Sequence, residues 1–143
     1  MSKFSERLNE LITDKNLSPE ELGQKIGFSG RTIRHWLNDE HSVFRSQLIK
    51  LAIYFNCPID FIAGRIDFYN DFSHKECPPF IEQLYKVLNE RGVSTYKLNK
   101  DTSIKFSYLT RYRRGTEPHL YSLIELADYL NCSIDYLIGF EAD

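Results

Sequence analysis

The stretch LIELADYLNCSIDYLIG at residues 123–139 decides the fold of this chain, because it occurs twice. Residues 48–64 read LIKLAIYFNCPIDFIAG, and ten of the seventeen aligned positions are identical at a constant offset of 75. In both copies an amphipathic run at helical spacing meets an Asn-Cys turn, and a second, shorter helical run follows. A repeat at a fixed spacing predicts two similar structural units, each of which closes over the residues that precede it.

Length and composition set the broad class of the protein. The chain has 143 residues, of which 42% are hydrophobic and 14% aromatic, so it is expected to fold rather than to be disordered. No apolar run approaches the length of a membrane span, and the N-terminal residues MSKFSERLNE lack the apolar core of a signal peptide. We therefore predict a soluble, cytoplasmic protein that makes no contact with a membrane.

The three cysteines do not indicate a disulfide or a metal site. Cys57 and Cys132 occupy the same position of the repeat, so we interpret both as small buried hydrophobic residues. Cys77 follows His74 with an H-x-x-C spacing, but no second pair of ligands follows it. The sequence predicts no metal and no cofactor.

Strong helix signals precede the first copy of the repeat. The quartet SPEE at residues 18–21 is a capping box with proline at the first helical position. Gly27 can end that helix in a left-handed conformation, and Ser29 can cap the next helix, GRTIRHWL at residues 30–37. Two short helices joined by a glycine-containing turn describe a helix-turn-helix.

Residues 80–143 repeat this order at an offset of 76, with one residue lost before the fourth helix. Nothing in either unit alternates with period two, so no sheet is expected. The predicted fold class is all-α, with two tandem five-helix bundles joined by a short aromatic-rich linker. The predicted domains are residues 1–65 and 80–143, and the linker is residues 66–79.

The linker is unusually rich in large apolar side chains for a connecting segment. It carries Ile66, Phe68, Tyr69 and Phe72. One interpretation is a segment that packs against one or both bundles. The other is a dimerisation or partner surface, because clustered exposed aromatic residues mark interfaces.

Each unit resembles the helix-turn-helix domain of the Cro and lambda-repressor (XRE) family. In the first unit the matching residues are Leu22, Ile26, Gly27, Ser29, Ile33, Trp36, Leu48, Leu51, Ala52, Asn56, Ile59, Asp60 and Gly64. Their counterparts include Leu98, Leu109, Tyr112, Gly115, Pro118, Leu123, Leu126, Ala127, Ser133, Ile134, Asp135, Leu137 and Gly139. The resemblance implies a DNA-binding transcriptional regulator, usually a repressor, whose partners are double-stranded DNA and a second copy of the chain.

Helical geometry selects the candidate DNA contacts of the first unit. If Ile33 and Leu37 face the core, Arg31 and His35 point directly away from it, with Thr32 and Arg34 on the flanks. The resemblance places base-reading positions at Gly30, Arg31 and His35, and phosphate contacts at Ser18 and Arg45. Arg31 is the best candidate for a bidentate contact to guanine. The candidate set is Ser18, Gly30, Arg31, Thr32, Arg34, His35 and Arg45.

In the second unit, Leu109 is expected to face the core. Two residues depart from the family pattern, because Ser103 replaces the turn residue Gly27 and Asn99 replaces the small Gly23. We therefore expect a reshaped turn before the second recognition helix. The candidate DNA-binding residues of this unit are Ser94, Ser107, Tyr108, Thr110, Arg111 and Arg114.

Charge leaves two functional classes open. The net charge is -2, but residues 97–115 hold six basic side chains against Asp101 alone. This local basic surface favours a sequence-specific DNA-binding regulator. The alternative is a protein-interaction module of a mobile element, antitoxin-like or an inhibitor, built on the same scaffold, and the acidic balance and irregular second turn favour it. An enzyme is not expected, because no carboxylate pair, Cys/His dyad, phosphate-binding glycine loop or metal cluster has usable spacing.

Overall fold

The computed structural model describes residues 2–141, and these residues form ten helices and no β-strand. This confirms the predicted all-α fold. The chain divides into two compact units, Met1–Phe72 and Ser73–Asp143. The division falls inside the segment that we assigned to the linker, so the extents 1–65 and 80–143 stay predictions.

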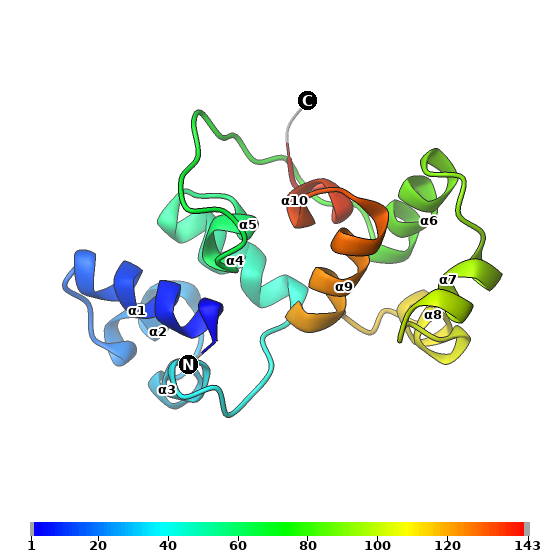
Figure 1. Ribbon diagram of the computed structural model, residues 1–143. Coiled ribbons are helices and arrows are strands. Elements are labelled where there is room, and N and C mark those ends of the chain that lie inside the picture. The colour runs from blue at the N-terminus through cyan, green and yellow to red at the C-terminus, as the bar shows by residue number, and fades with distance from the viewer. Residues whose placement is uncertain (1, 142–143) are drawn as a thin grey trace. The chain divides into compact units, whose positions relative to one another are not determined.

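Five helices make up each unit, in the same order (Figure 1). The first unit contains α1 (Lys3–Asp14), α2 (Pro19–Ile26), α3 (Gly30–Leu37), α4 (Arg45–Phe55) and α5 (Ile59–Ile62). The second contains α6 (Phe80–Glu90), α7 (Thr95–Asp101), α8 (Phe106–Arg113), α9 (Leu120–Leu130) and α10 (Ile134–Leu137). In both units the second and third helices are the helix-turn-helix pair that the sequence predicts.

Local chemistry sets the ends of α2 and α3. The Glu21 amide donates to the Ser18 hydroxyl over 3.1 Å, and the Glu21 carboxylate accepts from the Ser18 amide over 3.1 Å. Gly27 ends α2 with φ of 84°, in the left-handed region that favours glycine. The Ser29 hydroxyl then accepts from the Thr32 amide and starts α3. The predicted capping box and turn are confirmed.

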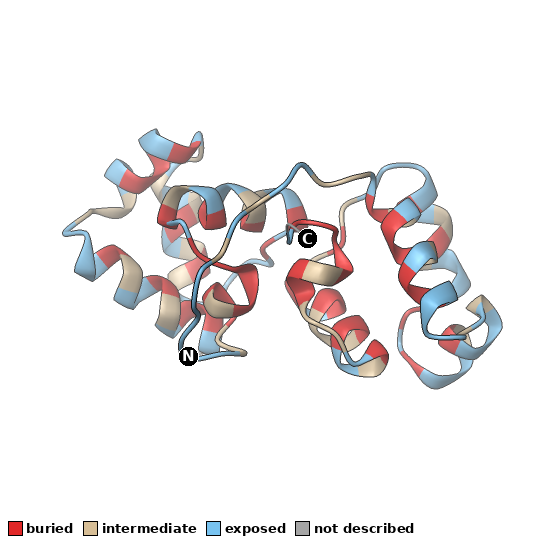
Figure 2. Cartoon of the chain, turned by 90° about the horizontal axis from the view of Figure 1, so that it is seen from above, coloured by how far each residue is buried: buried red, intermediate tan, exposed pale blue. Residues whose placement is uncertain are grey.

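Each unit has its own apolar core, to which every helix contributes at least one buried position (Figure 2). In the first unit the Trp36 side chain is 1% exposed, and its ring meets Phe4 edge-on with centroids 6.3 Å apart. In the second unit Tyr112 meets Phe80 in the same way, with centroids 5.1 Å apart. These pairs occupy equivalent positions at the offset of 76, so the repeat extends to the geometry of the core.

The aromatic-rich segment between the bundles is divided between them. On the first unit, the Tyr69 ring lies 5.0 Å from that of Phe61, and its hydroxyl donates to the Asn56 carbonyl over 3.3 Å. On the second, the Lys75 amide donates to the Phe140 carbonyl over 2.9 Å. The segment is therefore packed only in part, because Phe68 is 80% exposed.

The three cysteines lie in different surroundings. The three cysteines form no disulfide. Cys57 is buried as predicted, but Cys132 is half-buried, so the prediction of burial is wrong for that residue. Within residues 2–141, no three His, Cys, Asp or Glu side chains gather into a possible metal site. In the same span, no helix combines the length and apolar character that crossing a membrane requires.

One carboxylate ties the start of α1 to the end of α3. Asp39 accepts hydrogen bonds from the Ser2 hydroxyl over 2.6 Å, from the Ser5 hydroxyl and from the Ser2 amide over 2.8 Å. These bonds hold the pKa of Asp39 below its ordinary value of 3.8. Because the folded pKa is lowered, the stabilisation is complete above pH 3.8 and is lost as pH falls through the lowered value.

We predict that Asp39→Asn lowers the unfolding midpoint of the first unit by a few degrees at pH 7. Asparagine tolerates the left-handed φ of 58° at this position, so the substitution removes the charge without straining the backbone. The measurement is thermal unfolding followed by the fluorescence of Trp36, the one tryptophan of the chain. The unfolding midpoints of the variant and of the native protein should become equal in strong acid, where Asp39 is protonated. A difference that persists there would show that the loss is not electrostatic.

Candidate nucleic-acid interface

The buried face of α3 determines which side chains reach solvent. Ile33 and Trp36 are buried, at 0% and 1% exposure, whereas Leu37 is half-buried. The prediction that Leu37 faces the core together with Ile33 is therefore wrong. The large indole ring fills the space between Phe4 and Phe28, which rotates α3 about its axis. Arg31 stays on the exposed side.

The rotation brings Arg34 further onto the exposed face and His35 toward the protein. Arg34 is exposed, and the side chain of His35 is 23% exposed. Arg31 Nε donates to His35 Nε2 over 3.2 Å, and His35 Nδ1 lies 2.8 Å from Glu40 Oε2. Because Nε2 accepts, Nδ1 is the nitrogen that donates to Glu40. His35 was predicted to read a base; in this structure it holds Arg31 in place.

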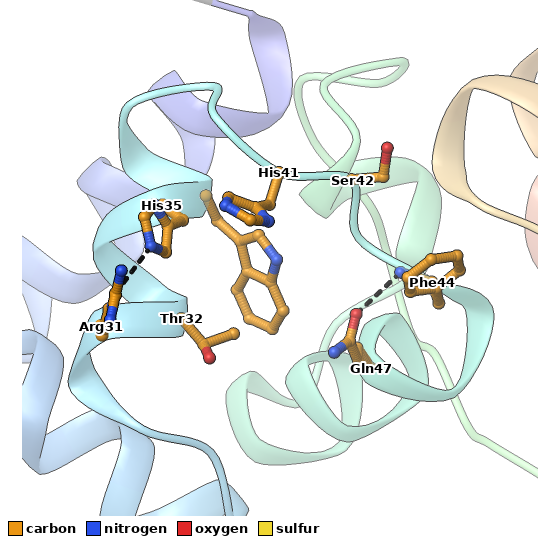
Figure 3. Close-up of a pocket in the computed structure, with 8 residues that line it drawn as sticks. Arg31, Thr32, His35, His41, Ser42, Phe44 and Gln47 are labelled. Carbon is orange, nitrogen blue, oxygen red and sulfur yellow. Dashed lines mark hydrogen bonds between the residues drawn. The ribbon is translucent and has the colours of Figure 1, made fainter.

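An open pocket of about 390 Å³ lies between α3 and the start of α4 (Figure 3). The rings of His35 and His41 face each other across its edge, with centroids 4.1 Å apart. The Gln47 side chain accepts from the Phe44 amide over 2.9 Å and closes the other side. The remaining lining residues are Arg31, Thr32, Trp36 and Ser42. Thr32, a predicted flanking contact, is half-buried at this pocket.

The surroundings of Arg45 and Ser18, the predicted phosphate contacts of the first unit, do not favour binding of a phosphate. Arg45 is buried, at 9% exposure, so its side chain does not project toward a ligand in solution. The prediction that Arg45 contacts a phosphate is therefore not supported. The Ser18 hydroxyl caps α2, and Glu20 and Glu21 place two carboxylates in the same turn. Negative charge at this end opposes a phosphate.

Glu20 also reaches the recognition helix itself. Its carboxylate forms an ion pair with the Arg34 guanidinium. A Cβ at Gly30 would lie 2.9 Å from the same side chain, so Glu20 covers the first residue of α3. Arg34 therefore has an internal partner of opposite charge, whereas the exposed Arg31 donates to the neutral imidazole of His35.

The second recognition helix, α8, presents its predicted face to solvent. Leu109 and Tyr112 are buried, at 0% and 7% exposure, on one side of the helix. Ser107, Arg111 and Arg114 are exposed, and Tyr108 and Thr110 are half-buried beside them. The Arg111 guanidinium stacks over the Tyr108 ring at 4.6 Å, which aims it along the outer face. Arg114 lies one residue beyond the end of α8.

The turn between α7 and α8 is reshaped, as predicted. The C-cap residue of α7, Thr102, is extended, with φ of -129°, whereas the C-cap residue of α2, Gly27, is left-handed. The Thr102 hydroxyl donates to the Leu98 carbonyl over 2.7 Å and accepts from the Ile104 amide over 3.0 Å. Asn99 Oδ1 accepts from the Phe106 amide over 2.8 Å and so caps α8 from outside the helix.

Exposed positive charge is denser on the second unit than on the first. The first turn of α7 contains no acidic residue, and the Ser94 hydroxyl accepts from the Lys97 amide over 3.0 Å. Two nearby carboxylates are engaged within the unit. Asp101 accepts from the Tyr129 hydroxyl over 2.8 Å, and Glu125 accepts from the Ser103 amide over 2.8 Å. Six basic side chains of this region are exposed: Lys97, Lys100, Lys105, Arg111, Arg113 and Arg114.

Three exposed aromatic residues near this surface were missed by the sequence reasoning. Tyr96 is 68% exposed, Phe106 is 48% exposed and Tyr121 is 59% exposed. The repeat itself carried a signal for two of them. At the offset of 76, Tyr96 stands where the first unit has Glu20, and Phe106 stands where it has Gly30.

Comparison with protein families agrees with the geometry of both units. Residues 8–62 match the model of a helix-turn-helix family, and residues 83–143 match that of the Cro/C1-type HTH DNA-binding domain. Searches of curated proteins and of solved structures each gave no match. The two family matches cover separate units and place the helix-turn-helix pair inside each. The chain therefore contains two tandem helix-turn-helix domains of the XRE type, the type to which Cro and lambda repressor belong.

Proposed function

We propose that the protein is a sequence-specific DNA-binding transcriptional repressor that uses both helix-turn-helix units of one chain. Each unit places its recognition helix, α3 or α8, in the major groove of double-stranded DNA. The observation that carries the proposal is the matching exposure of the two helices. In both, an arginine lies opposite the buried face, Arg31 in α3 and Arg111 in α8.

The two arginines have surroundings that suit base recognition. His35 holds the Arg31 side chain through its Nε atom, which leaves the two terminal nitrogens of the guanidinium for a bidentate contact to guanine O6 and N7. Tyr108 supports Arg111 through its ring. Both side chains are thus oriented before DNA arrives, which reduces the entropy lost on binding.

The electrostatic contribution comes mainly from the second unit. Its exposed lysines and arginines can neutralise phosphates, while the net charge of -2 limits attraction to DNA by the rest of the chain. Repression is the regulatory outcome that the resemblance to Cro and lambda repressor implies.

We predict a non-palindromic binding site about one and a half to two turns long. A dimer with one reader per chain selects a palindrome, because two identical helices select identical half-sites. The outer faces of α3 and α8 differ, so one chain that uses both cannot prefer identical half-sites. Footprinting combined with the mass of the complex in solution tests this. A short, perfect palindrome bound by a dimer would contradict the use of both helices.

Selection of bound duplexes from a random DNA pool, followed by a salt titration, tests the function as a whole. We expect an enriched sequence, and an affinity that falls log-linearly with salt concentration as phosphate counterions are released. If no sequence is enriched and random DNA is not bound at low salt, the protein is not a DNA-binding regulator. A protein-interaction module on the same scaffold would then be the better explanation.

A further inference from the structure

The aromatic side chains at the start of α8 have no counterpart in the first unit. Phe106 is the first residue of α8, and 48% of its surface is exposed. The equivalent residue of α3 is Gly30, which carries no side chain and is covered by Glu20. In the second unit the position of Glu20 is taken by Tyr96, which is 68% exposed. The second unit therefore has two exposed aromatic side chains, Tyr96 and Phe106, at the positions where the first unit has Glu20 and Gly30.

Folding of the second unit does not explain an exposed ring at position 106. The residue is tied in place through its amide, which donates to Asn99 Oδ1 over 2.8 Å, and its neighbour Leu109 supplies the buried contact of α8. Phe106 is a large, half-exposed apolar side chain at the start of the recognition helix, in a unit whose exposed surface is rich in lysine and arginine. A basic surface of this kind favours a polyanionic ligand such as DNA.

The position of Phe106 narrows the chemistry of that contact. In a helix-turn-helix, the N-terminal residues of the recognition helix lie against base edges, while the preceding helix crosses the backbone. The base edges in the major groove are polar except for the C5-methyl group of thymine. A phenyl ring at the first position of α8 can therefore discriminate bases only through that methyl group.

We propose that Phe106 reads thymine methyl groups in the major groove and gives the second unit a thymine preference. The inference rests on the proposed function, because it requires α8 to enter duplex DNA. It assigns different chemistry to the two halves of the site. Arg31 reads guanine by hydrogen bonds in one half, and Phe106 reads thymine by apolar contact in the other.

Replacing thymine by deoxyuridine tests the proposal, because it removes the methyl group and leaves the Watson–Crick face unchanged. The probe is the duplex recovered from the random pool, with its thymines replaced one at a time. We expect a loss of affinity of about fourfold at one or two thymines, as for the loss of one buried methyl group. These thymines should lie in the half of the site that Arg31→Ala leaves unaffected. A native protein indifferent to every replacement would overturn the proposal.

Two variants connect the methyl group to the side chain. Phe106→Ala should bind the thymine duplex several-fold more weakly and should no longer distinguish it from the deoxyuridine duplex. Phe106→Leu keeps an apolar side chain and should keep part of the discrimination. Circular dichroism melting of each variant confirms that the fold is intact, as expected for an exposed residue.

Three further results would each contradict the proposal, for different reasons. If Phe106→Ala binds weakly but still discriminates against deoxyuridine, another residue reads the methyl group and the proposal is wrong. If Phe106→Ala binds both duplexes as tightly as the native protein, Phe106 does not contact DNA and serves another partner, such as a protein. The proposal is then again wrong. If the native protein selects no duplex at all, the proposed DNA-binding function fails, and this inference fails with it.

Discussion

Gly23→Ala is expected to lower the free energy of unfolding of the first unit by about 3 kcal/mol. A Cβ at this position would lie 2.3 Å from the Phe28 carbonyl oxygen and 3.2 Å from the Ser29 carbonyl carbon. Both obstructing atoms belong to the backbone of the turn that leads into α3. Relief therefore requires α2 and α3 to separate, which disrupts the core around Trp36. A unit of this size has little stability to lose.

Tryptophan fluorescence during urea unfolding measures this effect in the first unit alone, because Trp36 is the one tryptophan of the chain. Gly30→Ala is the matched control. Its Cβ would lie 2.9 Å from the Glu20 side chain, which can move aside, so stability should be little changed. Equal destabilisation by the two substitutions would show that the close approach of α2 to the backbone of the turn is not the cause.

Arg31→Ala is expected to weaken binding to the selected site by about 2 kcal/mol, or roughly thirtyfold, and to relax the preference at one base pair. The side chain is exposed and oriented by His35, so its removal takes away a base contact without opening the core. A bidentate contact to guanine makes a contribution of this size to discrimination. The measurement is affinity for the selected duplex and for each single base-pair variant of it.

Arg34→Ala is the control for charge, because it removes the same group one turn along α3. The carboxylate of Glu20 already neutralises Arg34, so this variant should bind only slightly more weakly, and equally so for all sequences. If Arg31→Ala also weakens binding equally for all sequences, Arg31 contacts a phosphate and does not read a base.

Local signals in the sequence predicted most of the fold. The capping box at Ser18, the left-handed turn at Gly27 and the helical spacing of the apolar residues all act within a few residues, and all three are confirmed. The start of α4 does not follow from the apolar pattern alone, because the helix begins at Arg45, two residues after the apolar Val43. Val43 is buried, at 3% exposure, in the preceding loop, so its apolar character served the core and not the helix.

The candidate site was less predictable because it depends on contacts between elements. Helical spacing alone could not decide between Trp36 and Leu37 as the second core residue of α3, since either lies beside Ile33. The choice depends on whether distant Phe4 leaves room for an indole ring. In the same way, the burial of Arg45 depends on the packed unit and not on the residues beside it in the sequence.

The exposed Phe106 was missed for a different reason. An apolar residue at the start of a predicted helix is interpreted as a core residue by default. The resemblance marked the equivalent Gly30 as a base-reading position, but this assignment was not carried over to Phe106 in the second unit. The exchange of Gly30 for Phe106 is nevertheless present in the two repeats, and aligning them position by position is enough to find it.

The attachment of the inter-bundle segment to both units limits the freedom of the chain between them. Tyr69 holds one end to the first unit, and Lys75 holds the other to the second. When one unit is bound to DNA, so short a tether keeps the other at a local concentration in the millimolar range. A unit that dissociates from DNA rebinds before the chain diffuses away. On the proposed function, the protein would therefore stay on its site far longer than either unit alone, even if both bind weakly.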